Sequence, residues 1–219
     1  MTQYKLIIFD FDGTLAITHQ AIVSCIAKTF ENFQVAPPAA EQIIGTIGIS
    51  LPNAFKILYP AIEVTEIPQW IETYRSYYRT EGEKQLDIFS GTKEILQLAS
   101  QSGLSLGVIS NKHVNFVNSF LEKSQLHTFF DLIVGDNGEI VQKPNPTVFY
   151  SIIKPLFPEL DNSQFLVVGD TAVDLLFAKN AQIDSCWAAY GYGDPTQCLA
   201  LKPNFVINEI AELAAIVTN

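Results

Sequence analysis

Short apolar segments typical of buried strands alternate with helical patterns over most of this chain. The first is Tyr4–Ile8, and those that follow lie at 104–110, 130–136, 165–170, 185–191 and 205–208. Apolar residues spaced three and four apart, as at 172–181, separate them. Strands that alternate with helices favour a parallel sheet with right-handed crossovers. We therefore predict an α/β fold with a Rossmann-like parallel sheet.

The chain between the first two of these strands has a different pattern and is nearly all helical. Helical spacing runs from about His19 to Phe33 and returns where Trp70 and Tyr74 lie on one face. We interpret residues 17–86 as an α-helical domain inserted into the α/β core. The core then consists of residues 1–16 and 87–219.

The composition is that of a folded protein from a reducing compartment. Hydrophobic residues make up 48% of the 219, yet the apolar runs are far too short to span a bilayer. The three cysteines form no disulfide or zinc pattern, and the N-terminus lacks the features of a signal peptide. A net charge of −10 opposes binding to nucleic acid. We expect a cytoplasmic protein, monomeric or homodimeric, without a membrane or nucleic-acid partner.

Polar side chains gather where the predicted strands end. The residues found there are Asp10, Asp12, Ser110, Asn111, Asp170 and, one helical turn further on, Asp174. Lys143 lies in the loop "QKPNP". The carboxyl ends of parallel strands form the edge at which open α/β sheets bind ligands. We therefore expect these side chains to converge on one site.

Carboxylates that converge in this way repel one another unless a cation joins them. Oxygen ligands without histidine or thiolate suit Mg²⁺, which leaves coordination positions for water and phosphate. Lys143 adds a positive charge, and Ser110 adds a hydroxyl that can donate to a phosphoryl oxygen. The residues themselves thus predict a Mg²⁺ site that holds a tetrahedral phosphate group.

Four segments resemble, in order and spacing, the four motifs of the haloacid dehalogenase superfamily: "DFDGTL", "ISN", "KPNP" and "VGDTAVDLLFAKNA". The resemblance extends over essentially the whole chain and is to phosphatases with an α-helical cap inserted after the first motif. The segments "SNK", "YGYG" and "PNFVINEIAEL" are similar to phosphoglycolate-phosphatase-like proteins in particular. The resemblance implies a Mg²⁺-dependent hydrolase that acts on a small phosphorylated metabolite.

The resemblance also implies roles for the residues of the first and last motifs. Asp10 would be the nucleophile that forms an aspartyl-phosphate. Asp12 would protonate the leaving oxygen and then deprotonate the water that hydrolyses this intermediate. Mg²⁺ would bind Asp10, the backbone carbonyl of Asp12, and Asp170. Asp174 would orient metal-bound water or Lys143.

The middle two motifs would hold the phosphate group. By the same resemblance, Ser110, the backbone amide of Asn111 and Lys143 would contact the phosphoryl oxygens. Lys143 would then belong to the catalytic residues together with the two aspartates of the first motif.

The choice of substrate would depend on the cap. Contacts with the leaving part of the substrate are expected from Gly45, Thr46 and Lys112, and we predict 2-phosphoglycolate as the substrate. A nucleotide or pyrophosphate phosphatase stays open as an alternative, as do a sugar-phosphate mutase and a non-catalytic scaffold. Ile17 and Ser90 stand where the superfamily usually has Asp and Pro, near the hinges of the cap. The way in which the cap closes is therefore not predicted.

Overall fold

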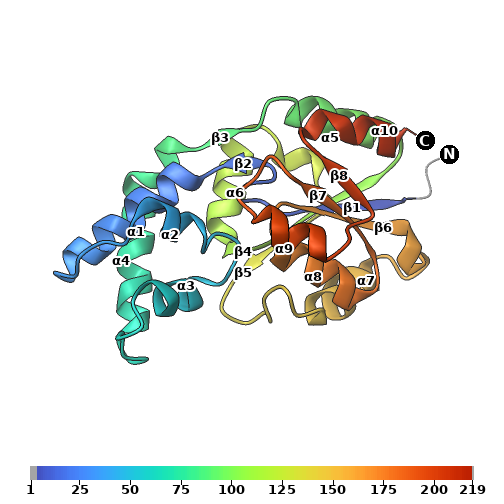
Figure 1. Cartoon of the computed structure of the whole chain (residues 1–219). Helices are drawn as coiled ribbons and strands as arrows, with labels where there is room; N and C mark the ends of the chain where they lie inside the picture. Colours follow the sequence, from blue (N-terminus) through green and yellow to red (C-terminus); the bar gives the residue numbers. More distant parts are fainter. Residues whose placement is uncertain (1–3, 219) are drawn as a thin grey trace.

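The computed structural model describes residues 4–218 and centres on one parallel sheet (Figure 1). Its strands are β1 (Leu6–Phe9), β4 (Ser105–His113), β5 (Leu132–Asp136), β6 (Phe165–Gly169), β7 (Asp184–Ala188) and β8 (Phe205–Ile207). They lie in the order β5-β4-β1-β6-β7-β8. The chain moves outward from β1 through β4 to β5 and then returns to β6 on the other side of β1. Such a reversal is the switch point at which open α/β sheets bind ligands, and the predicted α/β fold is confirmed.

Helices flank this sheet. They are α5 (Thr92–Gln101), α6 (Val114–Lys123), α7 (Lys154–Leu156), α8 (Ala172–Ala181), α9 (Pro195–Ala200) and α10 (Ala214–Val217). Shorter turns of other helix types are η2 (His127–Phe129), η3 (Phe149–Ile153), η4 (Asn162–Gln164) and η5 (Ile210–Leu213). No helix within residues 4–218 combines the length and the apolar character needed to cross a membrane.

Alternate residues of β1 face two separate apolar cores. Ile7 and Phe9 pack in a cluster that includes residues of α5, α6 and α10. Leu6 and Ile8 pack in a second cluster, with residues of η3 and α8. All four side chains are fully buried. Because both faces of the sheet are covered, its central strands are continuous apolar runs rather than alternating ones.

Strand β4 continues beyond its predicted end. The sequence predicted an end at Ser110, whereas β4 extends to His113, with an irregular register between Ile109 and His113. Asn111 and Lys112 therefore stand on the strand itself. Irregular pairing of this kind bends a strand and redirects its side chains, which is common next to functional sites.

The chain between β2 (Ala16–Ile17) and β3 (Asp87–Ile88) forms a separate group of helices, at the left of Figure 1. This helical unit comprises α1 (His19–Asn32), α2 (Ala40–Ile44), α3 (Leu51–Leu58), α4 (Ile67–Thr80) and η1 (Gly82–Gln85). It has an aromatic core, in which the Trp70 ring stacks on Phe33 at 4.5 Å and meets Phe30 edge-on at 5.0 Å. Phe116 of α6 joins this core and connects the helical unit to the sheet.

The chain enters and leaves the helical unit through a short antiparallel pair of strands, which the sequence did not predict. Ala16 pairs with Ile88, and Ile17 pairs with Asp87. Two residues on each side are too few to show a period of two. Ile17, where the superfamily usually has Asp, is thus a strand residue at the first connection.

Candidate active site

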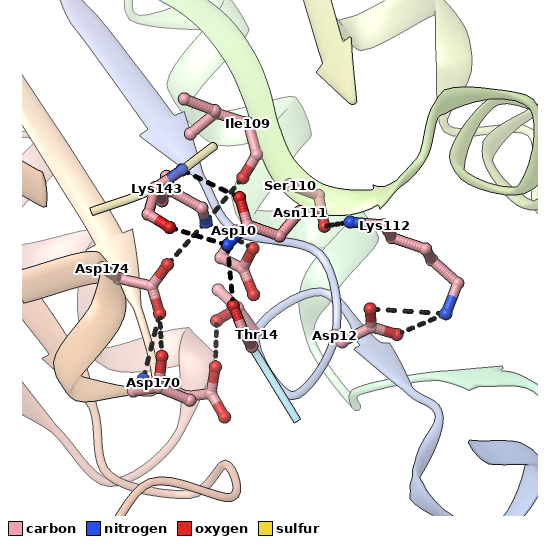
Figure 2. Close-up of polar contacts among 12 residues, drawn as sticks. Asp10, Asp12, Thr14, Ile109, Ser110, Asn111, Lys112, Lys143, Asp170 and Asp174 are labelled. Carbon is pink, nitrogen blue, oxygen red and sulfur yellow. Dashed lines mark hydrogen bonds and ion pairs between the residues drawn. The ribbon is translucent and has the colours of Figure 1, made fainter. Parts of the chain in front are cut away.

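The carboxyl ends of the central strands bring most of the predicted side chains together around Lys143 (Figure 2). Its Nζ donates to Asp10 Oδ1 at 2.7 Å, to Asp174 Oδ1 at 2.6 Å and to the carbonyl oxygen of Ile109 at 2.8 Å. An ammonium has three donors, so these contacts use all of them. The Lys143 side chain is only 1% exposed. It is therefore a fixed, buried positive charge beside the predicted nucleophile.

Asp10, Asp170 and Asp174 form a buried carboxylate cluster. One oxygen of each lies within 4.8 Å of the others. Asp170 also accepts hydrogen bonds from the Thr14 hydroxyl at 3.3 Å and from the backbone amide of Tyr192 at 2.7 Å. These donors come from opposite ends of the chain, and together they fix the direction of the Asp170 carboxylate.

Both oxygens of Asp174 are engaged by protein donors. Oδ1 accepts from Lys143, and Oδ2 accepts from the backbone amide of Thr171 at 3.0 Å and from its hydroxyl at 2.8 Å. Thr171 and Asp174 thereby cap the N-terminus of α8. This arrangement favours a role for Asp174 in orienting Lys143 over a role as a direct metal ligand.

The carboxylate cluster has more negative charge than its protein neighbours balance. Burial raises the pKa of Asp10 to about 7; Lys143 opposes this rise and Asp174 adds to it. Burial likewise raises the pKa of Asp170 well above its usual range, and the charges of Asp174 and Asp10 raise it further. When all three carboxyl groups are ionised, the one ammonium beside them leaves two negative charges without compensation. A divalent cation would balance them, and carboxylate oxygens are the ligands that Mg²⁺ prefers, so the residues fit this ion.

Gly13 allows the first motif to approach Asp170. Its φ of +82° is in the left-handed region, and a Cβ at this position would lie 2.2 Å from Asp170 Oδ2. Only glycine avoids both the backbone strain and the clash. The glycine of the first motif is thus required by its close packing against the carboxylate cluster.

Ser110 and Asn111 lie beside this cluster, but the two side chains make different contacts. The Asn111 side chain donates to the carbonyl oxygens of Gly48 and Lys143, both at 2.9 Å, and accepts from the Lys143 amide at 2.9 Å. It therefore ties the Lys143 loop and the helical unit to β4. The Ser110 hydroxyl accepts from the Lys112 amide at 3.2 Å and has no acceptor for its own proton among residues 4–218. That proton is available to a ligand.

Asp12 does not join the carboxylate cluster. Its carboxylate points toward Lys112, whose Nζ lies 2.9 Å from Oδ1 and 3.3 Å from Oδ2 (Figure 2). Burial lowers the pKa of Lys112, but Asp12 and other neighbouring groups raise it by more, so the net shift is upward. Lys112 is therefore charged, and the two residues form a buried ion pair.

A cavity of about 70 Å³ lies between the core and the helical unit. The core contributes Asp10, Asp12, Ser110 and Lys112, and the helical unit contributes Thr46, Ile47, Gly48, Tyr74 and Arg75, among others. Thr46 thus lines the cavity, and its hydroxyl donates to the carbonyl oxygen of Ile43. Gly45 is exposed and does not line the cavity, and Gly48 of the same turn takes that place.

Arg75 was not singled out by the sequence. It pairs with Asp136 of β5 at 3.4 Å and so connects α4 to the core. Its Nε is buried without a hydrogen-bond partner among the described residues. In the sequence Arg75 is one of several cations on the helical unit, and its ion pair with Asp136 distinguishes it in the structure.

Tyr192 is a second residue whose position was not predicted. Its amide donates to Asp170, while its hydroxyl accepts from the amides of Thr18 and His19 at 2.8 and 3.3 Å. Tyr192 therefore connects the carboxylate cluster to the start of the helical unit. The segment "YGYG" was a signal for this position, but it gave no indication of the contacts.

Comparison with known proteins agrees with this geometry. A family model described as haloacid dehalogenase-like hydrolase matches residues 7–188. The chain is 27% identical to pyrophosphatase PpaX of Halalkalibacterium halodurans, over 98% of this chain and 97% of that protein. It is 28% identical to a phosphoglycolate phosphatase of Agrobacterium fabrum, over 95% of this chain and 90% of that protein. A haloacid dehalogenase-like family hydrolase of Streptococcus pneumoniae has a similar structure, with a TM-score of 0.85 and 26% identity over 98% of this chain and 99% of that one.

The sheet order and the buried lysine and carboxylates at its switch point define an α/β enzyme. Because the family model matches well over half of its length, the chain belongs to the haloacid dehalogenase-like hydrolase family. The predicted membership is confirmed. The names of these two relatives state different substrates, so together they do not indicate a single substrate.

Proposed function

We propose that this protein is a Mg²⁺-dependent phosphatase that hydrolyses 2-phosphoglycolate to glycolate and phosphate through an aspartyl-phosphate on Asp10. The observation that carries the proposal is the contact of Lys143 Nζ with Asp10 and Asp174, at 2.7 and 2.6 Å. A buried carboxylate held by a fixed ammonium is arranged for in-line attack on a phosphoryl group. At the coarser level, the chain is a hydrolase of phosphoric monoesters, as its family and the phosphatase names of its relatives indicate.

The proposed reaction has two steps. First, an oxygen of Asp10 bonds to phosphorus while the bond from phosphorus to the leaving oxygen breaks, and Asp12 gives a proton to that oxygen. Asp12 then takes a proton from the water that attacks the phosphorus of the intermediate. The water oxygen leaves in inorganic phosphate, and Asp10 is regenerated as a carboxylate. The Ser110 hydroxyl and the Asn111 amide hold the phosphoryl oxygens throughout, and Lys143 contributes its positive charge beside them.

Asp10, Asp170 and the backbone carbonyl of Asp12 would hold Mg²⁺ in this proposal. When bound, the ion neutralises negative charge that develops on the phosphoryl oxygens. The two negative charges that the ionised carboxylate cluster would leave uncompensated support its presence. Asp174 keeps Lys143 in place, since both of its oxygens are occupied by protein donors.

The cavity supports a small leaving part with an acidic group of its own. Its volume of about 70 Å³ suits a leaving part of a few heavy atoms. Lys112 and Arg75 line it and can pair with a carboxylate. Ile22 and Ile47 give the same cavity an apolar wall, which suits the carbon atoms of glycolate better than a second phosphate. These features favour 2-phosphoglycolate over pyrophosphate.

The helical unit would act as the cap domain, with the boundaries predicted from the sequence, 17–86. It closes one side of the cavity through Thr46, Tyr74 and Arg75. A cap excludes water from the reaction and selects the leaving group. A cytoplasmic location and a monomeric or homodimeric state stay predictions.

Phosphate release from a substrate panel tests the proposal. The panel contains 2-phosphoglycolate, pyrophosphate, a nucleoside monophosphate and a hexose phosphate, each with Mg²⁺ and with EDTA. We expect release that requires Mg²⁺, with the highest kcat/KM for 2-phosphoglycolate. A higher kcat/KM for another phosphate would overturn the substrate and keep the mechanism. No release from any of them by folded protein would overturn the phosphatase proposal itself.

A further inference from the structure

Lys112 forms its ion pair with Asp12, the predicted acid–base residue, rather than with the carboxylate cluster. Its Nζ contacts both oxygens of Asp12, at 2.9 and 3.3 Å. The side chains of Lys112 and Asp12 are only 8% and 10% exposed. In Figure 2 the Asp12 carboxylate points toward Lys112 and away from Asp10. The ion pair thus fixes the direction of Asp12 in the structure.

The helical unit also contacts this ion pair. Lys112 Nζ lies 4.3 Å from the centroid of the Tyr78 ring of α4 and 5.8 Å from that of Phe11. An ammonium over the face of an aromatic ring is attracted by the ring's electrons. Tyr78 is fully buried, so water does not replace this contact. Lys112 is therefore held between Asp12 of the core and an aromatic ring of the helical unit.

This arrangement conflicts with the task of Asp12 in the proposed reaction. A general acid must lie within hydrogen-bond reach of the leaving oxygen, which is attached to the phosphorus that Asp10 attacks. Lys112 engages both oxygens of Asp12, so the Asp12 carboxylate must turn before it can serve. Lys112 itself lines the cavity that would receive the leaving part of the substrate. The Lys112 ammonium therefore takes part both in the entry of the leaving part and in the release of Asp12.

We propose that Lys112 is a positioning residue that keeps Asp12 turned away from Asp10 until an acidic group on the leaving part of the substrate binds the Lys112 ammonium. The proposal rests on the proposed phosphatase function. A buried ammonium is costly without a partner, so an entering anion must replace Asp12 before Asp12 can leave. The substrate class is therefore a small phosphomonoester with a second acidic group. A phosphomonoester whose leaving part has no acidic group fills the site without releasing Asp12 efficiently.

Two substrates that differ only in this acidic group test the proposal. One is 2-phosphoglycolate, and the other is 2-hydroxyethyl phosphate, in which an alcohol replaces the carboxylate. With wild-type enzyme and Mg²⁺, we expect kcat for 2-phosphoglycolate to be about tenfold higher or more. In Lys112→Met this kcat ratio should fall to about one, because Asp12 is no longer held and the acidic group gives no advantage. Lys112→Arg should restore most of the ratio, because it restores the positive charge.

Arg75→Gln is the matched control, since Arg75 lines the same cavity but pairs with Asp136 rather than with Asp12. This variant should raise KM for 2-phosphoglycolate while keeping the kcat ratio between the two substrates. A similar loss of the ratio in Arg75→Gln and Lys112→Met would mean that cavity charge in general is responsible, and would overturn the proposal. An equal fall in kcat for both substrates in Lys112→Met would also overturn it.

Crystal structures of wild-type protein and Lys112→Met, both without substrate, separate this proposal from the phosphatase function. We expect Asp12 to contact Lys112 in the wild type and to turn toward Asp10 in the variant. An unchanged Asp12 in a folded variant would overturn the proposal. If wild-type protein released phosphate from no substrate, the phosphatase proposal would fail, and this pair of structures would still decide whether Lys112 holds Asp12.

Discussion

The ammonium of Lys143 lies 2.6 Å from Asp174, and the two side chains are 1% and 2% exposed. Asp174 stands in the first turn of α8, where an acidic residue is favoured in any case by the helix dipole. Its contact with Lys143 gives it a second purpose, which is to hold the ammonium beside Asp10. The two purposes can be separated by experiment.

Asp174→Asn keeps the shape of the side chain and removes the charge that holds Lys143. We expect kcat to fall about 10- to 100-fold, as is usual when a residue that orients a catalytic group is lost. Thr171→Val is the matched control, because it removes the hydroxyl bond to Asp174 Oδ2 and leaves the Lys143 contact intact. Steady-state kinetics of both variants are the measurement. An equal loss in Thr171→Val would show that capping of α8, and not the position of Lys143, is what matters.

The charge of the carboxylate cluster predicts how Mg²⁺ and pH together affect stability. Burial raises the pKa of Asp10 from 3.8 to about 7, so the folded state binds more protons than the unfolded state between these values. The free energy of unfolding of metal-free protein therefore falls as the pH rises through this range. Bound Mg²⁺ favours the ionised carboxylates and removes this loss.

Thermal unfolding with Mg²⁺ and with EDTA measures this linkage. We expect Mg²⁺ to raise the Tm more at about pH 8 than at about pH 5. The additional rise should be roughly 2–4 °C for each kcal/mol by which Mg²⁺ increases the free energy of unfolding more at the higher pH. Asp10→Asn, which cannot ionise at this position, should show a smaller difference between the two pH values. A Tm increase that is independent of pH would mean that Mg²⁺ binds elsewhere.

The close approach of Gly13 to Asp170 predicts a large effect of one methyl group. Gly13→Ala combines backbone strain at φ +82° with a Cβ 2.2 Å from Asp170 Oδ2. Gly103→Ala has the same kind of strain at φ +77° with nothing within 4 Å of the added Cβ. We expect Gly103→Ala to lose about 1 kcal/mol of stability and keep its activity. Gly13→Ala should lose more than that and most of its activity, measured by urea unfolding and phosphate release. Similar effects of the two variants would contradict the packing argument.

Loss of the Tyr192 hydroxyl should destabilise the start of the helical unit locally. It accepts from the amides of Thr18 and His19, and Tyr192→Phe would leave both donors unpaired, at a cost of about 1–2 kcal/mol. Amide hydrogen exchange of Thr18 and His19 should become faster. Tyr190→Phe is the control, because that hydroxyl donates to the Thr14 carbonyl and does not touch these amides. Equal protection in Tyr192→Phe and wild type would contradict the predicted connection.

The sequence predicted the sheet well because its strands are buried on both faces. Leu6, Ile7, Ile8 and Phe9 are all apolar, and each packs in a core above or below the sheet. The convergence of Asp10, Asp170 and Lys143 could also be predicted, since the carboxyl ends of parallel strands meet at one edge. Asp174 was placed one turn into the following helix, and α8 begins as expected.

What the sequence did not predict depends on contacts between distant segments. The partner of Asp12 is Lys112, one hundred residues away, and no local sequence pattern predicts this ion pair. Arg75 differs from the other cations of the helical unit only because α4 brings it to Asp136. The pairing of Ile17 with Asp87 is too short to leave a period in the sequence. In each case the deciding energy comes from tertiary packing rather than from local preference.

In the proposed mechanism, Asp10 becomes covalently phosphorylated during turnover. The most direct measurement is mass spectrometry of the peptide that contains Asp10, after rapid acid quenching of enzyme that is turning over 2-phosphoglycolate with Mg²⁺. We predict one added phosphoryl group on Asp10 in wild-type enzyme, and none in Asp10→Asn or in the presence of EDTA. Steady release of phosphate by wild-type enzyme, with no phosphorylated Asp10 in either wild-type enzyme or Asp12→Asn, would contradict this mechanism and point to direct attack by water.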